Sequence, residues 1–129
     1  MRVITLNVNG IRSAAKKGLF AWLPRQQADV VCLQEVKAQE ADLTEQMRAP
    51  KGFHGFFNYA EKKGYAGVAL YARREPDQVR AGFGSKEHDD EGRYLQADFG
   101  KLSVVSIYLP SGSAGPHRQE SKFRFMEHF

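Results

Sequence analysis

Two hydrophobic runs near the start of the chain, each followed by polar residues, predict two buried strands. The first covers residues 2–6 and the second covers residues 29–33. Between them, apolar residues at helical spacing predict a helix at residues 13–23, with Ser13 as its N-cap. A strand, a helix and a strand in this order are typical of α/β proteins.

The rest of the chain alternates in ways that predict one more helix and two hairpins before a final helix. The second helix is expected at residues 40–48, and an exposed loop at residues 81–91. The predicted hairpins pair residues 53–59 with 67–73, and residues 93–99 with 102–109 around Gly100. A glycine-rich loop at residues 110–116 and a helix beginning near His117 complete the pattern.

Length and composition indicate a globular domain or part of one. The last predicted helix runs to Phe129 without a polar stop, so we expect residues 1–129 to be an incomplete domain whose C-terminal half is missing. Cys32 is the only cysteine and lies inside the second hydrophobic run, which predicts a core residue and no intrachain disulfide. Without a leader or a run long enough to cross a bilayer, we expect a cytoplasmic protein with no membrane contact. The oligomeric state stays open, with a monomer expected at full length.

Polar side chains stand at the ends of three of the predicted strands. Asn7 follows the first strand, Glu35 the second and Tyr108 the last. In open α/β sheets, ligands bind beyond the carboxyl ends of the strands. A carboxylate after a buried run is costly unless a positive charge meets it. Glu35 is therefore the first candidate ligand for a hard divalent cation, which prefers oxygen ligands and keeps several waters.

This constellation suits magnesium-assisted hydrolysis of a phosphodiester. The metal would neutralise phosphate charge and stabilise the leaving oxygen. Asn7 would orient a water or a phosphate oxygen, and Tyr108 would hydrogen-bond the phosphate or the attacking group. Arg12 and Lys37 lie beside these positions in the sequence and suit backbone phosphates. The formal net charge of +4 favours an anionic partner weakly.

Structural explanations compete with this chemistry. Asn7 is also a common residue of turns, Asn9 before a glycine favours turn chemistry over catalysis, and Tyr108 alone fits an ordinary strand aromatic. Glu35 after an apolar run is the hardest residue to explain structurally, so function is favoured there. Tyr65 beside two lysines fits either a hairpin turn or a contact with a nucleic-acid backbone. The histidines lack metal-ligand spacing and receive no role.

Five stretches of the sequence together are similar to the bacterial exonuclease III family, within the endonuclease/exonuclease/phosphatase superfamily. They are Asn-Val-Asn-Gly-Ile-Arg at 7–12, Leu-Gln-Glu-Val-Lys at 33–37, Gly-Tyr-Ala-Gly-Val-Ala-Leu-Tyr at 64–71, Glu-Gly-Arg at 91–93 and Tyr-Leu-Pro-Ser-Gly at 108–112. They occur in the family's order and span nearly the whole chain. The resemblance implies the N-terminal half of a four-layered αββα sandwich. It also implies 3′-to-5′ exonuclease and abasic-site endonuclease activity on duplex DNA in repair, with Mg²⁺ or Mn²⁺.

The resemblance also assigns residues. Glu35 matches the family's metal-binding glutamate, Asn7 its active-site asparagine and Tyr108 its active-site tyrosine. The positions that match DNA-backbone contacts are Arg12, Tyr65 and Arg93. Asn9 stands where some relatives carry aspartate. The family's later motifs, which supply further aspartates, an asparagine and a histidine, are absent, since no aspartate follows Asp98.

Two other functions stay open at this point. A phosphoesterase of the same fold would act on lipid or inositol phosphates, although the basic charge and the stretch at 64–67 favour DNA. Alternatively, the 129-residue chain by itself is a non-catalytic fragment with weak affinity for DNA, because the groups that activate water are missing.

Overall fold

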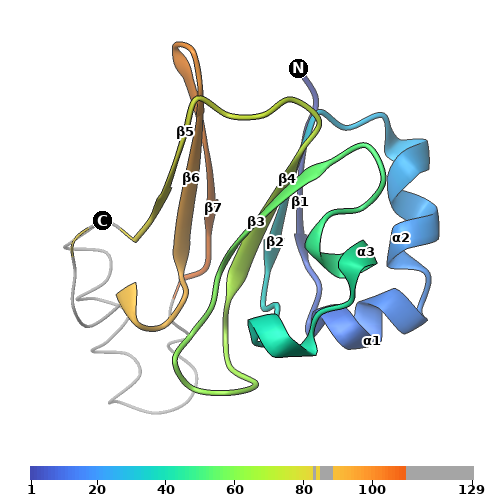
Figure 1. The fold of residues 1–129 in the computed structure, drawn as a ribbon, viewed down its shortest axis with the longest axis vertical. Helices are drawn as coiled ribbons and strands as arrows, with labels where there is room; N and C mark the ends of the chain where they lie inside the picture. The colour runs from blue at the N-terminus through green and yellow to red at the C-terminus, as the bar shows by residue number, and fades with distance from the viewer. Residues whose placement is uncertain (83, 85–88, 110–129) are drawn as a thin grey trace.

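The computed structural model describes residues 1–82, 84 and 89–109. It contains two β-sheets packed face to face, with helices on the outer side of one sheet (Figure 1). The first sheet has the order β1-β2-β4-β3 and the second the order β5-β6-β7. The strands are β1 (Val3–Asn7), β2 (Val30–Gln34), β3 (His54–Asn58), β4 (Val68–Ala72), β5 (Gln78–Ala81), β6 (Tyr94–Phe99) and β7 (Leu102–Ile107). The fold is therefore mixed α/β; the fourth, helical layer stays a prediction.

The pairing of the strands follows the predicted hairpins with one addition. β1 and β2 are parallel and joined by helices, whereas β4 runs antiparallel to both β2 and β3. β6 and β7 form the predicted hairpin around Gly100. β5 was not predicted, because its four residues include little apolar character beyond Val79 and lie at an edge of the second sheet, where no burial pattern is required.

The prediction of one helix from Ser13 to residue 23 is wrong. The segment forms α1 (Ile11–Lys16), α2 (Leu19–Trp22) and a 3₁₀ turn, η1 (Leu23–Gln26). α1 begins after Gly10 rather than at Ser13. Gly18 has a φ of +99°, in the left-handed region that ends helices, so it separates α1 from α2.

The second predicted helix, at residues 40–48, is likewise two short pieces. These are the 3₁₀ turn η2 (Glu40–Asp42) and α3 (Glu45–Arg48). The Thr44 hydroxyl accepts a hydrogen bond from the backbone N–H of Met47 at 3.3 Å. A residue that caps a helix in this way has extended backbone, so Thr44 starts a new helix and interrupts the first.

The core consists of two layers on opposite faces of the first sheet. Val31 and Leu33 of β2 point toward the helices, and the alternate residues Val30 and Cys32 point toward the second sheet. Cys32 is 3% exposed, which confirms the prediction of a core cysteine. Because both faces of β2 are covered, the loop that follows it starts from a rigid strand.

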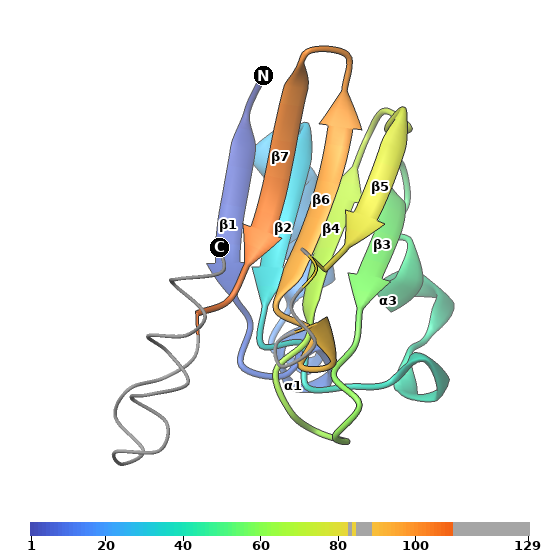
Figure 2. The same ribbon diagram turned by 90° about the vertical axis from the view of Figure 1, so that its left-hand side faces the viewer.

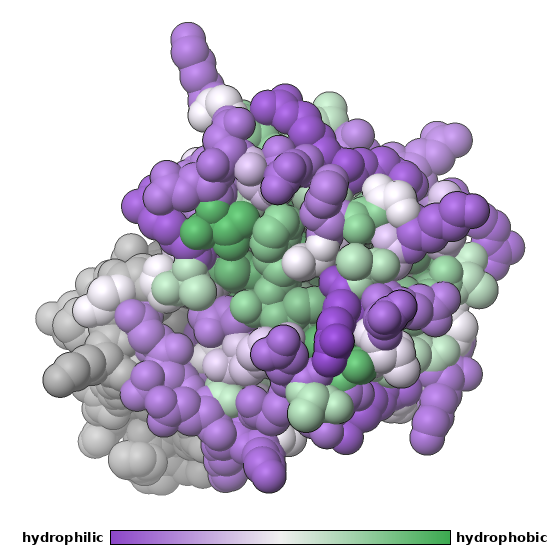
Figure 3. All heavy atoms as spheres, in the orientation of Figure 1, coloured by the Kyte–Doolittle hydropathy of each residue, from purple (hydrophilic) through white to green (hydrophobic). Residues whose placement is uncertain are grey.

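The edge strands of one sheet lie over the edge strands of the other. β1 and β7 lie along one side of the sandwich, and β3 and β5 lie along the other (Figure 2). The β3 and β5 side bears a hydrophobic area framed by hydrophilic residues (Figure 3). A hollow of about 430 Å³ there is lined by residues of both edges, including Phe56, Phe57 and Val79.

The predictions for the C-terminal part of the chain are not tested by the structure. The glycine-rich loop at residues 110–116 and the helix beginning near His117 lie outside the described residues. Among the helices that are described, none has the length and hydrophobicity of a membrane-spanning segment.

Candidate active site

Three loops meet at the end of the first sheet where β1 and β2 finish and β4 begins. The loop after β1 is joined to the loop after β2 by backbone hydrogen bonds from Gly10 N to Glu35 O, 2.7 Å, and from Ile11 N to Val36 O, 2.9 Å. The loop after β2 is joined to the segment before β4 by a bond from Lys37 N to Ala66 O, 2.8 Å. These bonds continue the sheet past its strands and fix the loops in place.

Backbone strain is concentrated in the same three loops. Asn9, Glu35, Lys37 and Ala66 all have positive φ, at 46°, 54°, 52° and 43°. Residues other than glycine rarely adopt this conformation, which costs on the order of 1–3 kcal/mol each. Four such residues linked by hydrogen bonds indicate that the loops hold their side chains in a required arrangement, as functional sites do.

Glu35 lies at the mouth of this arrangement. Its side chain is 20% exposed, and one carboxylate oxygen is 3.7 Å from the Lys37 ammonium. The other carboxylate oxygen accepts a hydrogen bond from the Tyr108 hydroxyl. The Lys37 ammonium also donates to Asn9 Oδ1 at 2.7 Å. The carboxylate is thus neither buried in the core nor closed off by an arginine, and cationic and phenolic groups face it.

Tyr108 brings the second sheet to this site, because it follows the last residue of β7. Burial, then the hydrogen bond and negative charge of Glu35, raise the pKa of the Tyr108 phenol to about 12. The hydroxyl therefore keeps its proton at neutral pH and acts as a hydrogen-bond donor.

Asn7 ends β1 directly beside Gln34 of the parallel strand β2. Its side chain is exposed, and its Oδ1 accepts a hydrogen bond from Asn9 N at 3.0 Å. This Asx-type contact and the positive φ of Asn9 support the turn role expected for Asn9. Whether Asn7 also binds a ligand stays a prediction.

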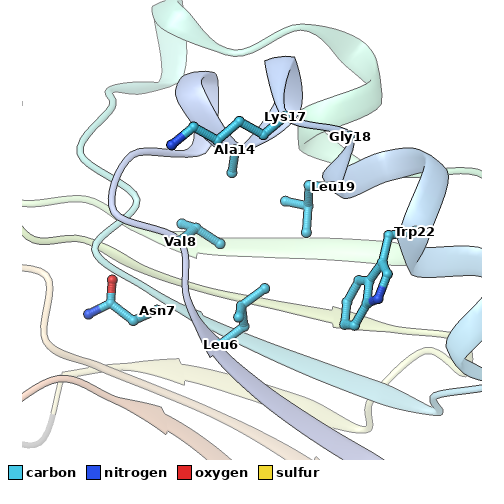
Figure 4. Close-up of a pocket in the computed structure, with 8 residues that line it drawn as sticks. All are labelled: Leu6, Asn7, Val8, Ala14, Lys17, Gly18, Leu19 and Trp22. Carbon is cyan, nitrogen blue, oxygen red and sulfur yellow. The ribbon is translucent and has the colours of Figure 1, made fainter.

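An apolar cavity lies beside Asn7, between β1 and the helices. It has a volume of about 340 Å³ and is lined mainly by apolar side chains, including Leu6, Leu19 and Trp22. The Asn7 amide points away from these apolar groups (Figure 4). Lys17 is the one charged residue among those that line this cavity, so the cavity offers no cluster of positive charge.

Arg12 and Lys37 place exposed positive charge next to Glu35. Their side chains are 51% and 40% exposed. Arg12 donates to the backbone carbonyl of Lys37 at 3.0 Å, and its guanidinium is 3.9 Å from the Asp42 carboxylate. Arg12 stands in the first turn of α1 and Lys37 follows Glu35 in the loop after β2, and exposed cations of this kind suit backbone phosphates.

Tyr65 and Arg93 form a second group beside Tyr108. The Arg93 guanidinium donates to the Tyr65 hydroxyl at 2.7 Å and to the Glu91 carboxylate at 3.2 Å. The Tyr65 ring also has the Lys62 ammonium 5.3 Å from its centre. Arg93 is only 1% exposed.

The burial of Arg93 bears on one expectation from the sequence. Its guanidinium is enclosed by the described residues and bonded within the protein. The contacts with DNA backbone expected for Arg93, Arg12, Lys37 and Tyr65 all stay predictions. The sequence assigned no role to Glu91. Opposite charges two residues apart, at Glu91 and Arg93, are the signal that could have predicted their pairing.

The oxygen ligands fit one end of a magnesium site. Mg²⁺ binds through one or two carboxylates and keeps several waters, so the half-open carboxylate of Glu35 suits it. Within the described part of the chain, no three of the His, Cys, Asp and Glu side chains come together as a metal-binding group. Glu35 would hold such an ion only together with further ligands, and a part for the Asn7 amide stays a prediction.

These features define an α/β sandwich with a polar, cation-lined site at the end of its strands. Residues 4–128 match the Endonuclease/Exonuclease/phosphatase family, and the chain belongs to that family. It is 38% identical over 128 residues to an exodeoxyribonuclease of Bacillus subtilis, covering 98% of this chain and 50% of that protein. It is also 38% identical over 120 residues to the DNA repair nuclease APEX1 of Danio rerio, covering 89% of this chain and 38% of that protein.

Solved structures agree with this relationship. An AP endonuclease from Archaeoglobus fulgidus superposes with a TM-score of 0.82 at 31% identity, covering 97% of this chain and 48% of the other. The chain is thus related to the exodeoxyribonuclease III and AP endonuclease proteins. It spans about half the length of the curated exodeoxyribonucleases that it matches.

Proposed function

We propose that this chain forms one half of a metal-dependent DNA-repair nuclease, with abasic-site endonuclease and 3′-to-5′ exonuclease activity on duplex DNA. The observation that carries the proposal is the contact between Glu35 on the first sheet and Tyr108 on the second, beside the exposed cations Arg12 and Lys37. The relatives' names support a DNA substrate, and those of AP endonucleases support abasic sites.

Each of the site residues would have a separate role in hydrolysis. Glu35, with Asn7, would hold Mg²⁺ or Mn²⁺, which when bound offsets phosphate charge and stabilises the leaving oxygen. Tyr108 would donate its proton as a hydrogen bond to a phosphate oxygen, since its raised pKa keeps it neutral. Arg12 and Lys37 would bind the flanking phosphates, and Tyr65 would contact the backbone beside them.

The same proposal predicts that the isolated 129-residue chain does not cleave DNA. Among the described residues, no three His, Cys, Asp or Glu side chains come together as a metal-binding group, and Asp42 and Glu91 are paired with Arg12 and Arg93, so a group that activates water is expected from elsewhere. Weak binding of DNA by Arg12 and Lys37 is expected to persist. Magnesium-dependent cleavage by a pure sample of this chain would contradict this part of the proposal.

The test is the nicking of abasic duplex DNA in magnesium by the full-length protein and its Glu35→Gln variant. We expect a loss of activity of at least about 100-fold, together with weaker Mn²⁺ binding measured by electron paramagnetic resonance. The control is Glu75→Gln, because Glu75 is an exposed residue that follows β4 at the opposite end of the sheet. Undiminished nicking by Glu35→Gln would reject the assignment.

A phosphoesterase that acts on lipid or inositol phosphates is the alternative within the family. The test is a comparison of abasic DNA with inositol phosphates and sphingomyelin under the same conditions. Preferential cleavage of DNA supports the proposal. Preferential hydrolysis of the inositol phosphates, read as released phosphate, or of sphingomyelin, read as released phosphocholine, would replace it.

A further inference from the structure

We propose that Arg93 is a positioning residue that holds Tyr108 against Glu35 and so sets the distance between the two sheets at the site. The inference rests on the proposed function for the importance of that contact, but its geometry stands by itself. Arg93 is 1% exposed and lies between the sheets, at the same end of the sandwich as Glu35.

Arg93 contacts Tyr108 at its backbone and at its ring. The backbone carbonyl of Arg93 accepts a hydrogen bond from Tyr108 N at 2.9 Å. Its guanidinium donates to the Tyr108 carbonyl at 3.3 Å and lies 5.3 Å from the centre of the Tyr108 ring. These contacts restrict both the chain and the ring of Tyr108, and the hydroxyl at the far end of that ring is the group that reaches Glu35.

Arg93 is itself fixed by groups from both sheets. A buried cation needs acceptors and an opposite charge, and Glu91 supplies the charge at 3.2 Å. Tyr65, from the segment before β4, accepts a further bond at 2.7 Å, and its ring centre is 5.6 Å from the guanidinium. The Tyr65 hydroxyl and Glu91 are 3.4 Å apart, so the three residues form a closed group.

The backbone around Arg93 is anchored to the first sheet in the same way. Gly92 has a φ of +61°, and a Cβ at that position would lie 2.6 Å from the backbone nitrogen of Ala60. The side-chain amide of Asn58 donates to the Tyr94 carbonyl at 2.8 Å. The segment is thus packed so closely on the chain after β3 that Arg93 has little freedom to move. Because Arg93 is fixed against the first sheet, it also fixes Tyr108 of the second sheet relative to the first.

Two other roles for Arg93 make different predictions. If Arg93 contacts a DNA phosphate directly, removing its charge should reduce the slope of log affinity against log salt concentration by about one. A purely structural ion pair would lower stability without affecting how Tyr108 senses Glu35. A positioning role predicts that the connection between Tyr108 and Glu35 is lost while the fold and the salt dependence are kept.

The experiment places 3-fluorotyrosine at position 108 of the full-length protein and records its ¹⁹F resonance at neutral pH without metal or DNA. With Arg93 present, Glu35→Gln should shift the resonance, because the phenol contacts that carboxylate. In an Arg93→Met background, we expect Glu35→Gln to shift the resonance much less. Arg93→Lys keeps the charge but not the planar fork, so it should restore only part of the effect.

Activity gives the second measurement. Arg93→Met should lower kcat by about 10- to 100-fold, as expected for a group that orients a catalytic side chain, with KM for DNA and its salt slope unchanged. If Arg93→Met does not fold, Tyr65→Phe replaces it, because this variant removes the hydroxyl that accepts from Arg93 and keeps the ring. It should also weaken the response of the resonance to Glu35→Gln.

An equal shift on Glu35→Gln with and without Arg93, in folded protein, would overturn the inference, and so would a salt slope reduced by about one. The resonance needs no nuclease activity. A protein that does not cleave DNA, but whose Tyr108 loses its response to Glu35 in Arg93→Met, would therefore reject the proposed function and retain this inference.

Discussion

The hydroxyl of Tyr108 donates a hydrogen bond to the carboxylate of Glu35, which lies 73 residues earlier in the chain. This contact joins the end of β7 in the second sheet to the loop after β2 in the first. It is the point at which the two sheets share one polar site. The groups around it, Lys37 and Arg93, supply positive charge on either side.

Tyr108 should act as a neutral donor over the working range of pH. Because the pKa of its phenol is raised to about 12, the hydroxyl stays protonated between about pH 6 and about pH 9. We expect Tyr108→Phe to lower kcat of the full-length protein by about 100- to 1,000-fold. The ratio of wild-type to variant activity should be constant across that range. A ratio that changes tenfold per pH unit there would show that the phenol ionises during catalysis.

Lys37 should weaken metal binding while it strengthens DNA binding. Its ammonium lies 3.7 Å from the Glu35 carboxylate, so it repels a cation held by the same carboxylate. In a solvated site, two unit charges about 4 Å apart interact by about 1 kcal/mol; a divalent ion that lies farther from the ammonium than the carboxylate does is repelled by a similar amount, about fivefold in affinity. We expect Lys37→Met to bind Mn²⁺ about fivefold more tightly. The same variant should bind DNA less tightly, with a salt slope reduced by about one.

The control for Lys37 is Lys16→Met, which removes a charge from the last turn of α1. It should leave Mn²⁺ affinity unchanged. Weaker rather than tighter binding of Mn²⁺ by Lys37→Met would show that Lys37 orients the Glu35 carboxylate instead of competing with the ion.

Gly92 should tolerate no side chain. Its positive φ of +61° is unfavourable for other residues, and an added Cβ would also lie 2.7 Å from the Asn58 carbonyl oxygen. We expect Gly92→Ala to lower the free energy of unfolding by about 3 kcal/mol, measured by urea denaturation. Gly64→Ala is a matched control, because Gly64 has a similar φ of +69° and nothing lies within 4 Å of an added Cβ. It should cost about 1 kcal/mol. Equal losses in the two variants would show that the close approach at Gly92 is not tight.

Cys32 should make stability fall at alkaline pH. Burial raises the pKa of its thiol from 9.0 to about 11. As pH rises above 9.0, the unfolded chain loses this proton while the folded protein keeps it, so deprotonation favours unfolding. The contribution is complete below pH 9.0 and is lost as pH rises toward about 11, by about 1.4 kcal/mol per pH unit.

The measurement for Cys32 is urea unfolding of the wild type and Cys32→Ala at several pH values on both sides of 9.0. The variant lacks the thiol, so the difference in free energy of unfolding between the two proteins should change by about 1.4 kcal/mol per pH unit above pH 9.0. A constant difference between the two proteins across this range would contradict the prediction.

Features that depend on neighbouring residues could be predicted from the amino-acid sequence. Hydrophobic runs ending in Asn7, Glu35 and Tyr108 correctly marked the ends of three strands. The burial of Cys32 and the hairpin at Gly100 followed from local alternation and turn chemistry. The family relationship also came from local stretches, because those residues keep their order and spacing.

Which of these residues contact one another could not be predicted, because it depends on how the two sheets pack. Arg93 looks like a surface cation in the sequence, and its burial depends on Glu91 and on Tyr65, which comes from the other sheet. The edge strand β5 formed with almost no apolar pattern because β6 supplied its hydrogen bonds. The positive φ of Glu35 is likewise maintained by bonds to two other loops. A one-dimensional pattern reports the preference of a residue for burial or for a strand, whereas its partners and the strain it bears depend on segments that only folding brings together.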